Sequence, residues 1–343
     1  MKILFLLKRN YDSAGAISGI LKSGLVNSVI ILSEALQEQG QEVKMHICID
    51  GNSIDKEVYN YRPDVCIIEA IWVTPAKLRQ IQKLHPTVLF ITRIHSKIPF
   101  LANEGNSLSW IKEYLEIPNV LIASNNYHTN RDFNNVGIPS IYLPNVYKHI
   151  NIQKFEKHKL RRPTEEISIA SFGAIRPLKN QLLQAFAAIH FANKYNLKLN
   201  FHINSGRIEQ QGDSVLKNIR AIFDNISHSL VEHKWSSHEE FLNVVSTMDI
   251  GMQCSYTESY NIVAADFVSQ GIPIVVSDEI YWMPCGMKAD MNDSEDIVKK
   301  LKTAYLHSKH ISLISAKALN KQRGEALFIW NRVLLFPLWE SLN

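Results

Sequence analysis

Short apolar runs alternate with amphipathic stretches along the first half of the chain. Residues 3–7 form a continuous apolar run, which is typical of a parallel strand buried on both faces. Apolar positions then recur at helical spacing over residues 26–39, and Gly40 follows as a C-cap. Pro75 opens a second predicted helix that continues to about Leu84. Further strands are predicted at residues 43–49, 65–69, 88–94, 120–124 and 140–143. This alternation predicts a doubly wound, mostly parallel sheet.

The alternation stops at a polar, charged stretch, residues 151–165, and then starts again. This stretch is the best candidate for a linker between domains. Strands are predicted at residues 167–172, 197–203, 249–253 and 272–276, and helices at 179–194, 214–224, 238–246 and 260–270. Two similar halves predict an α/β protein with two Rossmann-like domains that face each other across a cleft. The predicted domains span residues 1–155 and 156–325.

Composition narrows the class of protein. Apolar residues make up 46% and charged residues 20% of the 343 residues, so disordered, collagen-like and coiled-coil classes are excluded. The four cysteines show no CxxC spacing, and we interpret them as reduced, mostly buried thiols of a cytoplasmic protein. The apolar run at residues 3–7 is too short for a signal-peptide core or a membrane span.

Charge is uneven along the chain, although the formal net charge is only +4. Residues 1–165 hold 20 Lys+Arg against 15 Asp+Glu, whereas residues 166–343 hold the remaining 17 against 18. A basic N-terminal half is consistent with an anionic partner such as nucleic acid or a phospholipid surface. A random excess of charge on a solvated face explains the same numbers.

The polar turn 257–261 lies between a predicted strand and a predicted helix. Free N–H groups at the start of that helix, together with its dipole, predict an anion site. Glu258 lies at the mouth of the turn, and Asp266 follows a little over two helical turns later. We therefore expect both carboxylates on the same side of one helix, where they could meet sugar and ribose hydroxyls. The alternative is an ordinary capped helix with incidental acidic residues.

A second element combines a glycine turn with two cations. Gly173 follows a predicted strand, and Arg176 and Lys179 stand at the start of the next helix. Glycine lets the backbone approach a ligand, Arg offers a planar fork to phosphate oxygens, and Lys offers a point charge. Cations oppose the dipole at a helix N-terminus, so a bound anion explains them better than helix stability. A solvated basic surface is the alternative.

These elements together resemble the retaining GT-B glycosyltransferases of the family 4-like, E-x7-E type. The matching residues are Glu258, seven residues, Asp266, then Gly271-Ile272-Pro273-Ile274-Val275, with Gly173, Arg176 and Lys179 as the basic element. The usual second acid of that family is Glu, so Asp266 departs by one methylene. The resemblance implies that the C-terminal domain binds a nucleotide sugar, with Ser259, Tyr260, Asn261 and Ile262 also at the donor. It also implies a C-terminal helix, residues 326–343, that crosses back to the N-terminal, acceptor-binding domain.

The N-terminal half resembles glycosyltransferases encoded by tailed bacteriophages. The similar stretches are residues 23–28, 68–73 and 93–105. Gly24 opens a helix there, where its backbone could approach a diphosphate. The resemblance implies that His95 lies near the transferred sugar and the acceptor oxygen; a core histidine satisfied by backbone is the alternative. Ser96, Asn103 and Glu104 are candidates for the acceptor side, against the alternative of a solvated loop.

The chemistry that these residues predict needs no metal, because the chain contains no Asp-x-Asp. Arg176, Lys179 and the helix start would stabilise charge on the leaving diphosphate, and Glu258 would hold the donor sugar. The resemblance implies retention at the anomeric carbon, a UDP-sugar donor and no cofactor. It also implies action in a phage host's cytoplasm on double-stranded DNA that carries a modified, hydroxylated pyrimidine.

The same sequence features are compatible with other acceptors and with other classes of function. The acceptor could be a cell-surface glycan or a lipid-linked sugar, with peripheral membrane contact. A nucleotide-sugar 2-epimerase on the same fold and a DNA-binding module without catalysis are the rivals from other classes.

Overall fold

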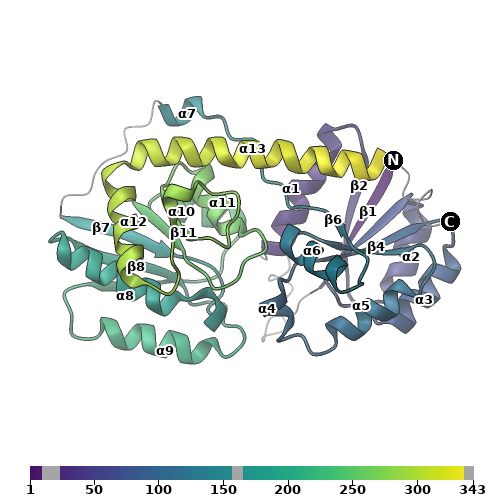
Figure 1. Ribbon diagram of the computed structural model, residues 1–343, viewed down its shortest axis with the longest axis horizontal. Helices are drawn as coiled ribbons and strands as arrows, with labels where there is room; N and C mark the ends of the chain where they lie inside the picture. Colours follow the sequence, from purple (N-terminus) through teal and green to yellow (C-terminus); the bar gives the residue numbers. More distant parts are fainter. Residues whose placement is uncertain (10–23, 157–164, 336–343) are drawn as a thin grey trace. The chain divides into compact units, whose positions relative to one another are not determined.

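The computed structural model describes residues 1–9, 24–156 and 165–335 of the chain (Figure 1). The chain divides into two units, one formed by Met1–Lys148 with Arg323–Asn343 and the other by His149–Gln322. We call these unit 1 and unit 2. Each unit is built on one sheet of six parallel strands, so the predicted α/β class is confirmed.

The sheet of unit 1 has the strand order β2-β1-β3-β4-β5-β6. Its strands are β1 (Lys2–Lys8), β2 (Glu42–Cys48), β3 (Val65–Glu69), β4 (Leu89–Ile94), β5 (Val120–Ser124) and β6 (Ile141–Tyr142). The helices between them are α1 (Gly24–Glu38), α2 (Ser53–Tyr61), α3 (Pro75–Leu84), α4 (Ile98–Leu101), α5 (Ser107–Leu115) and α6 (Tyr127–Asn135).

Strand β1 shows why its sequence is apolar at every position. Successive side chains of a strand point to opposite faces of the sheet. Ile3, Phe5 and Leu7 belong to one buried cluster, together with residues of α1. Leu4 and Leu6 belong to a second cluster with residues of α2, α3 and α5. Both faces of the sheet are therefore covered, as a parallel sheet requires.

The sheet of unit 2 has the order β12-β11-β10-β7-β8-β9. Its strands are β7 (Glu166–Ser171), β8 (Lys198–Asn204), β9 (Ser229–His233), β10 (Ile250–Gln253), β11 (Ile274–Ser277) and β12 (Lys288–Ala289). Its helices are α7 (Gln153–Glu156), η2 (Pro177–Lys179), α8 (Gln181–Lys194), α9 (Gly212–Phe223), α10 (His238–Val245), α11 (Ile262–Ser269), η3 (Cys285–Met287) and α12 (Ser294–Leu306).

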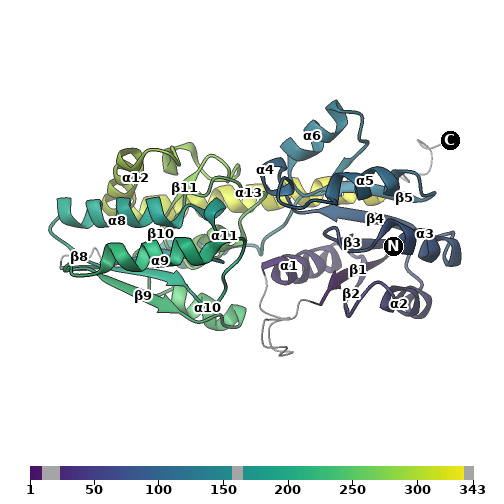
Figure 2. The same cartoon turned by 90° about the horizontal axis from the view of Figure 1, so that it is seen from below.

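The helices of unit 2 form two groups. Helix α8 packs against α9 and α12, while α10 packs against α11 (Figure 2). Right-handed crossovers explain this grouping, because β7 to β9 run outward in one direction and β10 to β12 in the other. Strands β7 and β10 are neighbours, so the chain leaves them toward opposite faces. Unit 1 has the same arrangement at β1 and β3. Ligands of open α/β sheets bind at the carboxyl ends of such strand pairs.

One long helix, α13 (Ser308–Leu335), contributes residues to both units. In unit 2, Ser312 Oγ donates to the carbonyl of Gly271 at 2.6 Å. In unit 1, Trp330 is fully buried and its Nε1–H donates to the carbonyl of Pro144 at 2.8 Å. The helix begins well before the predicted residue 326, and residues 336–343 of the predicted crossing segment lie outside the described residues.

Most predicted elements are present, with a few differences. The predicted strand 140–143 is reduced to β6, and the start of the predicted helix 179–194 is a 3₁₀ turn, η2. The predicted linker holds α7, and its residues 157–164 lie outside the described part. Several elements were not predicted, namely α2, α4, α5, α6, α12, β9 and β12. The polar helix α6 (YHTNRDFNN) and the half-exposed strand β9 show no clear apolar period that would have indicated them.

Two further observations bear on the class of protein. All four cysteines are free thiols; Cys48, Cys66 and Cys254 are buried, whereas Cys285 is exposed. In the described part of the chain, no helix combines the length and the apolar character that crossing a membrane requires.

Histidines of neighbouring strands should make the stability of the fold depend on pH. His202 on β8 and His233 on β9 stack, with Nδ1 of His202 2.9 Å from Nε2 of His233. Burial, helped by His233, lowers the pKa of His202 from 6.5 to about 4. The unfolded chain therefore binds more protons than the folded one between these values, so the free energy of unfolding should fall as pH falls from 6.5 to 4. Urea unfolding between pH 7 and pH 4 measures this slope.

The variant His202→Gln should flatten that slope, and His310→Gln, at an exposed position of α13, is the control. An equally steep slope in His202→Gln would show that another group carries the pH dependence.

Candidate functional site

The loop after β7 places two cations at the carboxyl end of the unit 2 sheet. Gly173 has a φ of +115°, which side-chain-bearing residues rarely adopt, and its N–H donates to Asn204 Oδ1 at 3.0 Å. A Cβ at this position would lie 3.8 Å from Lys179 Cε. The chain then forms η2, with Arg176 as its N-cap and Lys179 as its last residue. The predicted cations therefore stand on a 3₁₀ turn just before α8.

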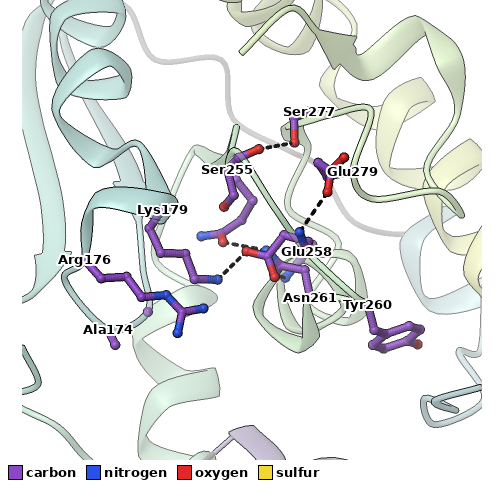
Figure 3. A network of polar contacts seen from close by, with 12 residues as sticks. Ala174, Arg176, Lys179, Ser255, Glu258, Tyr260, Asn261, Ser277 and Glu279 are labelled. Atoms are coloured by element: carbon purple, nitrogen blue, oxygen red, sulfur yellow. Dashed lines mark hydrogen bonds and ion pairs between the residues drawn. The ribbon is translucent and has the colours of Figure 1, made fainter. Parts of the chain in front are cut away.

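The loop after β10 brings Glu258 to Lys179. Lys179 Nζ donates to Glu258 Oε1 at 2.5 Å, and the two side chains are only 11% and 8% exposed (Figure 3). Burial lowers the pKa of Lys179, and the Glu258 carboxylate partly offsets that effect. The sequence prediction that these residues act together is consistent with this geometry: two charges distant in the sequence meet where β7 and β10 end.

Arg176 belongs to a second ion-pair group. Its Nη1 donates to Glu209 Oε2 at 3.1 Å, and Glu209 Oε1 lies 2.5 Å from Arg207 Nη2. The Arg207 guanidinium in turn covers the ring of Trp235 at 5.2 Å. Figure 3 shows the side chains of Arg176 and Lys179 extending alongside each other toward Glu258. Each predicted phosphate-binding cation is thus held in place by a carboxylate.

Two amides of the predicted anion site are already bonded to side chains, so the prediction of free N–H groups is wrong for them. The N–H of Glu258 donates to Glu279 Oε2 at 3.1 Å. The N–H of Ala264 donates at 2.8 Å to Oδ1 of Asn261, which is the N-cap of α11. Asn261 Nδ2 also donates to Gln253 Oε1 at 2.8 Å, which fixes its orientation.

The expectation that Glu258 and Asp266 share one helix face is also wrong. Helix α11 begins at Ile262, so Glu258 precedes it and only Asp266 lies on it. Asp266 is 2% exposed, and its Oδ1 lies 2.8 Å from His238 Nε2 on α10. The eight-residue spacing gave a wrong prediction because the residues before Ile262 belong to a loop, which does not follow helical periodicity.

The remaining predicted donor residues differ in their exposure. Tyr260 is buried, packs on Trp282 and donates from its hydroxyl to Gln322 Oε1 at 3.3 Å. In Figure 3 its ring points away from Lys179. Ser259 lies in the loop, and Ile262 is the half-buried first residue of α11. The buried ring of Tyr260 therefore helps to hold the loop 257–261 in place.

In unit 1, His95 lies in a buried polar cluster at the carboxyl ends of the strands. Its Nε2 makes a very short contact with Glu69 Oε2, and its Nδ1 lies 3.1 Å from Asn125 Nδ2. Burial lowers the pKa of His95, although Glu69 acts in the opposite direction. Burial alone would raise the pKa of Glu69, but Arg93 and His95 more than offset it and lower that pKa. The carboxylate is therefore ionised and the imidazole neutral at pH 7.

The predicted acceptor residues are brought together only in part. Ser96 Oγ donates to Glu104 at 3.4 Å, and Ser107 Oγ donates to the same carboxylate at 3.2 Å. Burial raises the pKa of Glu104, although both hydroxyls act to lower it. Asn103 is exposed, and its amide donates to the carbonyl of Pro99 instead. Gly24 is the first residue of α1, as predicted.

Several residues of these clusters were not predicted from the sequence to belong to a site. They are Glu69, Arg93 and Asn125 in unit 1 and Glu209, His238 and Glu279 in unit 2. A signal was available for the first two, because each is a charge inside an apolar strand run (VCIIE and LFITRI). Within residues 1–9, 24–156 and 165–335, no three His, Cys, Asp or Glu residues are grouped so that they could hold a metal ion.

Comparison with known proteins places the fold. No protein-family model and no curated protein matches the sequence. Among solved structures, α,α-trehalose 6-phosphate synthase from Burkholderia multivorans is similar, with a TM-score of 0.67 and 12% identity over 99% of this chain and 97% of that one. The synthase from Burkholderia xenovorans in complex with glucose-6-phosphate has a TM-score of 0.68 and 10% identity over 96% and 98% of the two chains.

A structure of the E. coli trehalose-6-phosphate protein bound with UDP-2-fluoro glucose has a TM-score of 0.64 and 10% identity over 95% and 96%. Likeness at this level of identity establishes the fold, which is GT-B.

The Lys179–Glu258 pair should be strongly coupled. Removing either partner leaves a nearly buried charge without its counter-charge, which costs about 3 kcal/mol. Because the double substitution to Ala removes both charges, it should cost less than the sum, with a coupling energy of about 1–3 kcal/mol. Urea unfolding of Lys179→Ala, Glu258→Ala and the double variant measures this coupling.

The exposed pair Lys198–Glu166, 3.0 Å apart in the same unit, is the matched control. We expect its coupling energy to stay below about 1 kcal/mol. Equal coupling in both pairs would contradict the special environment of Lys179.

Proposed function

We propose that the chain is a retaining, metal-independent glycosyltransferase that uses a nucleotide-diphosphate sugar, with UDP as the favoured nucleotide. The observation that carries the proposal is the cluster of Arg176, Lys179 and Glu258 where β7 and β10 of a GT-B fold end. Arg and Lys together suit phosphate oxygens, and a carboxylate suits sugar hydroxyls. The enzyme class, the donor and the role of each residue are parts of this proposal.

The ion pairs suggest how the donor would bind. The diphosphate of a nucleotide sugar carries two negative charges, as many as the carboxylates of Glu258 and Glu209 together, and its several oxygens suit both cations, so it would compete with these carboxylates for Lys179 and Arg176. Once released, the Glu258 carboxylate would be free to accept hydrogen bonds from the donor sugar. When the glycosidic bond breaks, the electron pair leaves with the diphosphate, and both cations stabilise that charge. Attack from the same face, assisted by the leaving phosphate, would retain the anomeric configuration.

One of the structural neighbours supports this donor class. One of them is bound with UDP-2-fluoro glucose and another with glucose-6-phosphate. Their likeness concerns the fold, so the donor must be identified by experiment.

For the acceptor, the proposal from the sequence is a hydroxylated pyrimidine in phage DNA. Its support is the resemblance of the N-terminal half and the basic charge of residues 1–165. Five of the 20 basic residues in that range lie between residues 154 and 162, beyond Lys148, where the first segment of unit 1 ends. Residues 1–148 hold 15 Lys+Arg against 13 Asp+Glu, so charge favours a DNA acceptor less than the sequence alone suggested.

The other functions are separated by simple measurements. A cell-surface glycan or lipid-linked acceptor would be accompanied by binding to anionic liposomes. A 2-epimerase would convert the donor with no acceptor present. A DNA-binding module would bind duplex DNA, more weakly at high salt, without consuming any donor. The pairing of Lys179 with Glu258 argues against the last function, because binding DNA requires no such carboxylate.

Thermal stability in the presence of nucleotides tests the donor site. A ligand at about 100 times its dissociation constant should stabilise the protein by about 2.7 kcal/mol. We expect a selective shift with UDP or a UDP-sugar, against GDP, ADP and CMP, that is lost in Arg176→Ala and Lys179→Ala. Arg220→Ala, which removes an exposed Arg–Glu232 pair from the same unit, is the control and should keep the shift. A full shift in both site variants would contradict the assignment.

Turnover tests the catalytic role and the acceptor. With a donor that binds, Arg176→Ala and Lys179→Ala should each lower turnover at least tenfold, or about 1.4 kcal/mol in the barrier. Sugar transfer is measured to hydroxymethylated duplex DNA, to glucose-6-phosphate and to a lipid-linked sugar, and NMR coupling constants give the anomeric configuration of the product. Inversion of the configuration, or donor conversion without any acceptor, would contradict the proposed reaction.

A further inference from the structure

Arg93 of unit 1 is fully buried, and all three of its side-chain nitrogens are hydrogen bonded. Its Nε donates to the carbonyl of Leu143 at 2.9 Å, and its Nη1 donates to both oxygens of Glu69 at 3.1 Å. Its Nη2 donates to Asn145 Oδ1 at 2.5 Å. Both Arg93 and Glu69 have 0% of their side chains exposed. The guanidinium therefore holds one orientation.

A fully buried ion pair contributes little net stability to a fold, because burying its two charges costs free energy. Removing two charges from water costs several kcal/mol each, and an apolar pair of similar volume is often as stable or more so. The pair lies at the carboxyl ends of β3 and β4, next to the strand pair where ligands of such sheets bind. Its position therefore points to a role in a site and not in the core.

Trp330 closes this cluster from the side of α13. Its ring lies 5.3 Å from the guanidinium carbon of Arg93 and 6.2 Å from the ring of Phe5. Its Nε1–H is fixed on the carbonyl of Pro144. Cation–π attraction is strongest with Trp and grows when water is excluded. The C-terminal helix thus keeps water away from Arg93.

The hydrogen bonds form a closed ring through His95. Arg93 donates to Glu69, which also accepts from His95 Nε2, because an ionised carboxylate can only accept. His95 Nδ1 then accepts from Asn125 Nδ2, which also donates to Asn145 Oδ1 at 3.4 Å. Asn145 accepts in turn from Arg93. A change of tautomer at His95, or a flip of the Asn125 amide, would break at least one bond of this ring.

We propose that Arg93 and Asn145 are positioning residues that, enclosed by Trp330, hold His95 in a single neutral tautomer with the proton on Nε2. The proposal rests on the proposed function and on the expectation, from the resemblance of the sequence, that His95 lies near the transferred sugar and the acceptor oxygen. With the proton on Nε2, the Nδ1 atom of His95 is the hydrogen-bond acceptor. A bound hydroxyl would donate to Nδ1 in place of the Asn125 amide. A neutral ring backed by a carboxylate suits this place, since the transferred sugar develops positive charge in an oxocarbenium-like transition state.

The test is ¹⁵N NMR of the histidine rings in the free protein, with His95 assigned through His95→Gln. The wild-type protein should show one His95 tautomer, protonated at Nε2, from pH 6.5 to 8. Asn145→Ala removes the acceptor shared by Arg93 and Asn125, and Trp330→Leu opens the cluster to water. Both variants should populate the second tautomer and lower kcat about tenfold with little change in the donor KM.

Matched controls separate positioning from general loss of packing. Asn134→Ala removes side-chain hydrogen bonds from an exposed position of unit 1, and Phe328→Ala truncates an exposed aromatic residue of α13. Both should keep the single tautomer and the wild-type kcat. Arg93→Lys retains the charge without the planar fork, and we expect it to behave like Asn145→Ala.

Two results would overturn the proposal. One is a mixture of tautomers in the wild-type protein. The other is a wild-type tautomer or wild-type kcat in folded Asn145→Ala and Trp330→Leu. The tautomer measurement needs no substrate, so a failure of the proposed glycosyltransferase activity would appear separately, as an absence of sugar transfer by the wild-type protein.

Discussion

Parallel strand pairing is the constraint on which the rest of this structure depends. In a parallel sheet every strand ends at the same edge, so residues distant in the sequence meet there. Lys179 and Glu258 are separated by 79 positions, and they form a buried ion pair because β7 and β10 are neighbours. Glu69 and Arg93 meet in the same way, because β3 and β4 pair in register with these two residues opposite each other.

The two ion pairs use this edge differently. The Arg93–Glu69 pair has no exposed side-chain surface and is enclosed by backbone carbonyls, Asn145 and Trp330. The Lys179–Glu258 pair keeps some exposure, and its neighbour Arg176 is 17% exposed. An enclosed pair keeps one geometry, whereas a partly exposed pair can exchange its partners for those of a ligand. The first arrangement suits orientation of a neighbouring group, and the second suits binding.

Much of the fold was predictable from hydrophobic periodicity, and the candidate site was predictable only in part. Continuous apolar runs such as residues 3–7 and 65–68 are typical of strands buried on both faces of a parallel sheet, and the structure has them there. Spacing alone misplaced Glu258 relative to α11, because a loop does not keep helical periodicity. The partners Glu209, His238 and Glu279 could not be predicted, since each comes from another loop or helix whose approach is set by tertiary packing.

Helix α13 has a consequence for the order in which the protein can fold during synthesis. Ala326, Trp330 and Leu334 fill the same buried cluster as Ile3, Phe5 and Val29, which are synthesised much earlier. Unit 1 therefore lacks part of its interior until α13 has been made. At roughly 5–20 residues per second, synthesis of the stretch between Lys148 and Arg323 takes about ten seconds or more, and part of one apolar face of the unit 1 sheet stays uncovered during that time. A unit that begins with β1 is thus completed by the second half of α13, after unit 2 has been synthesised.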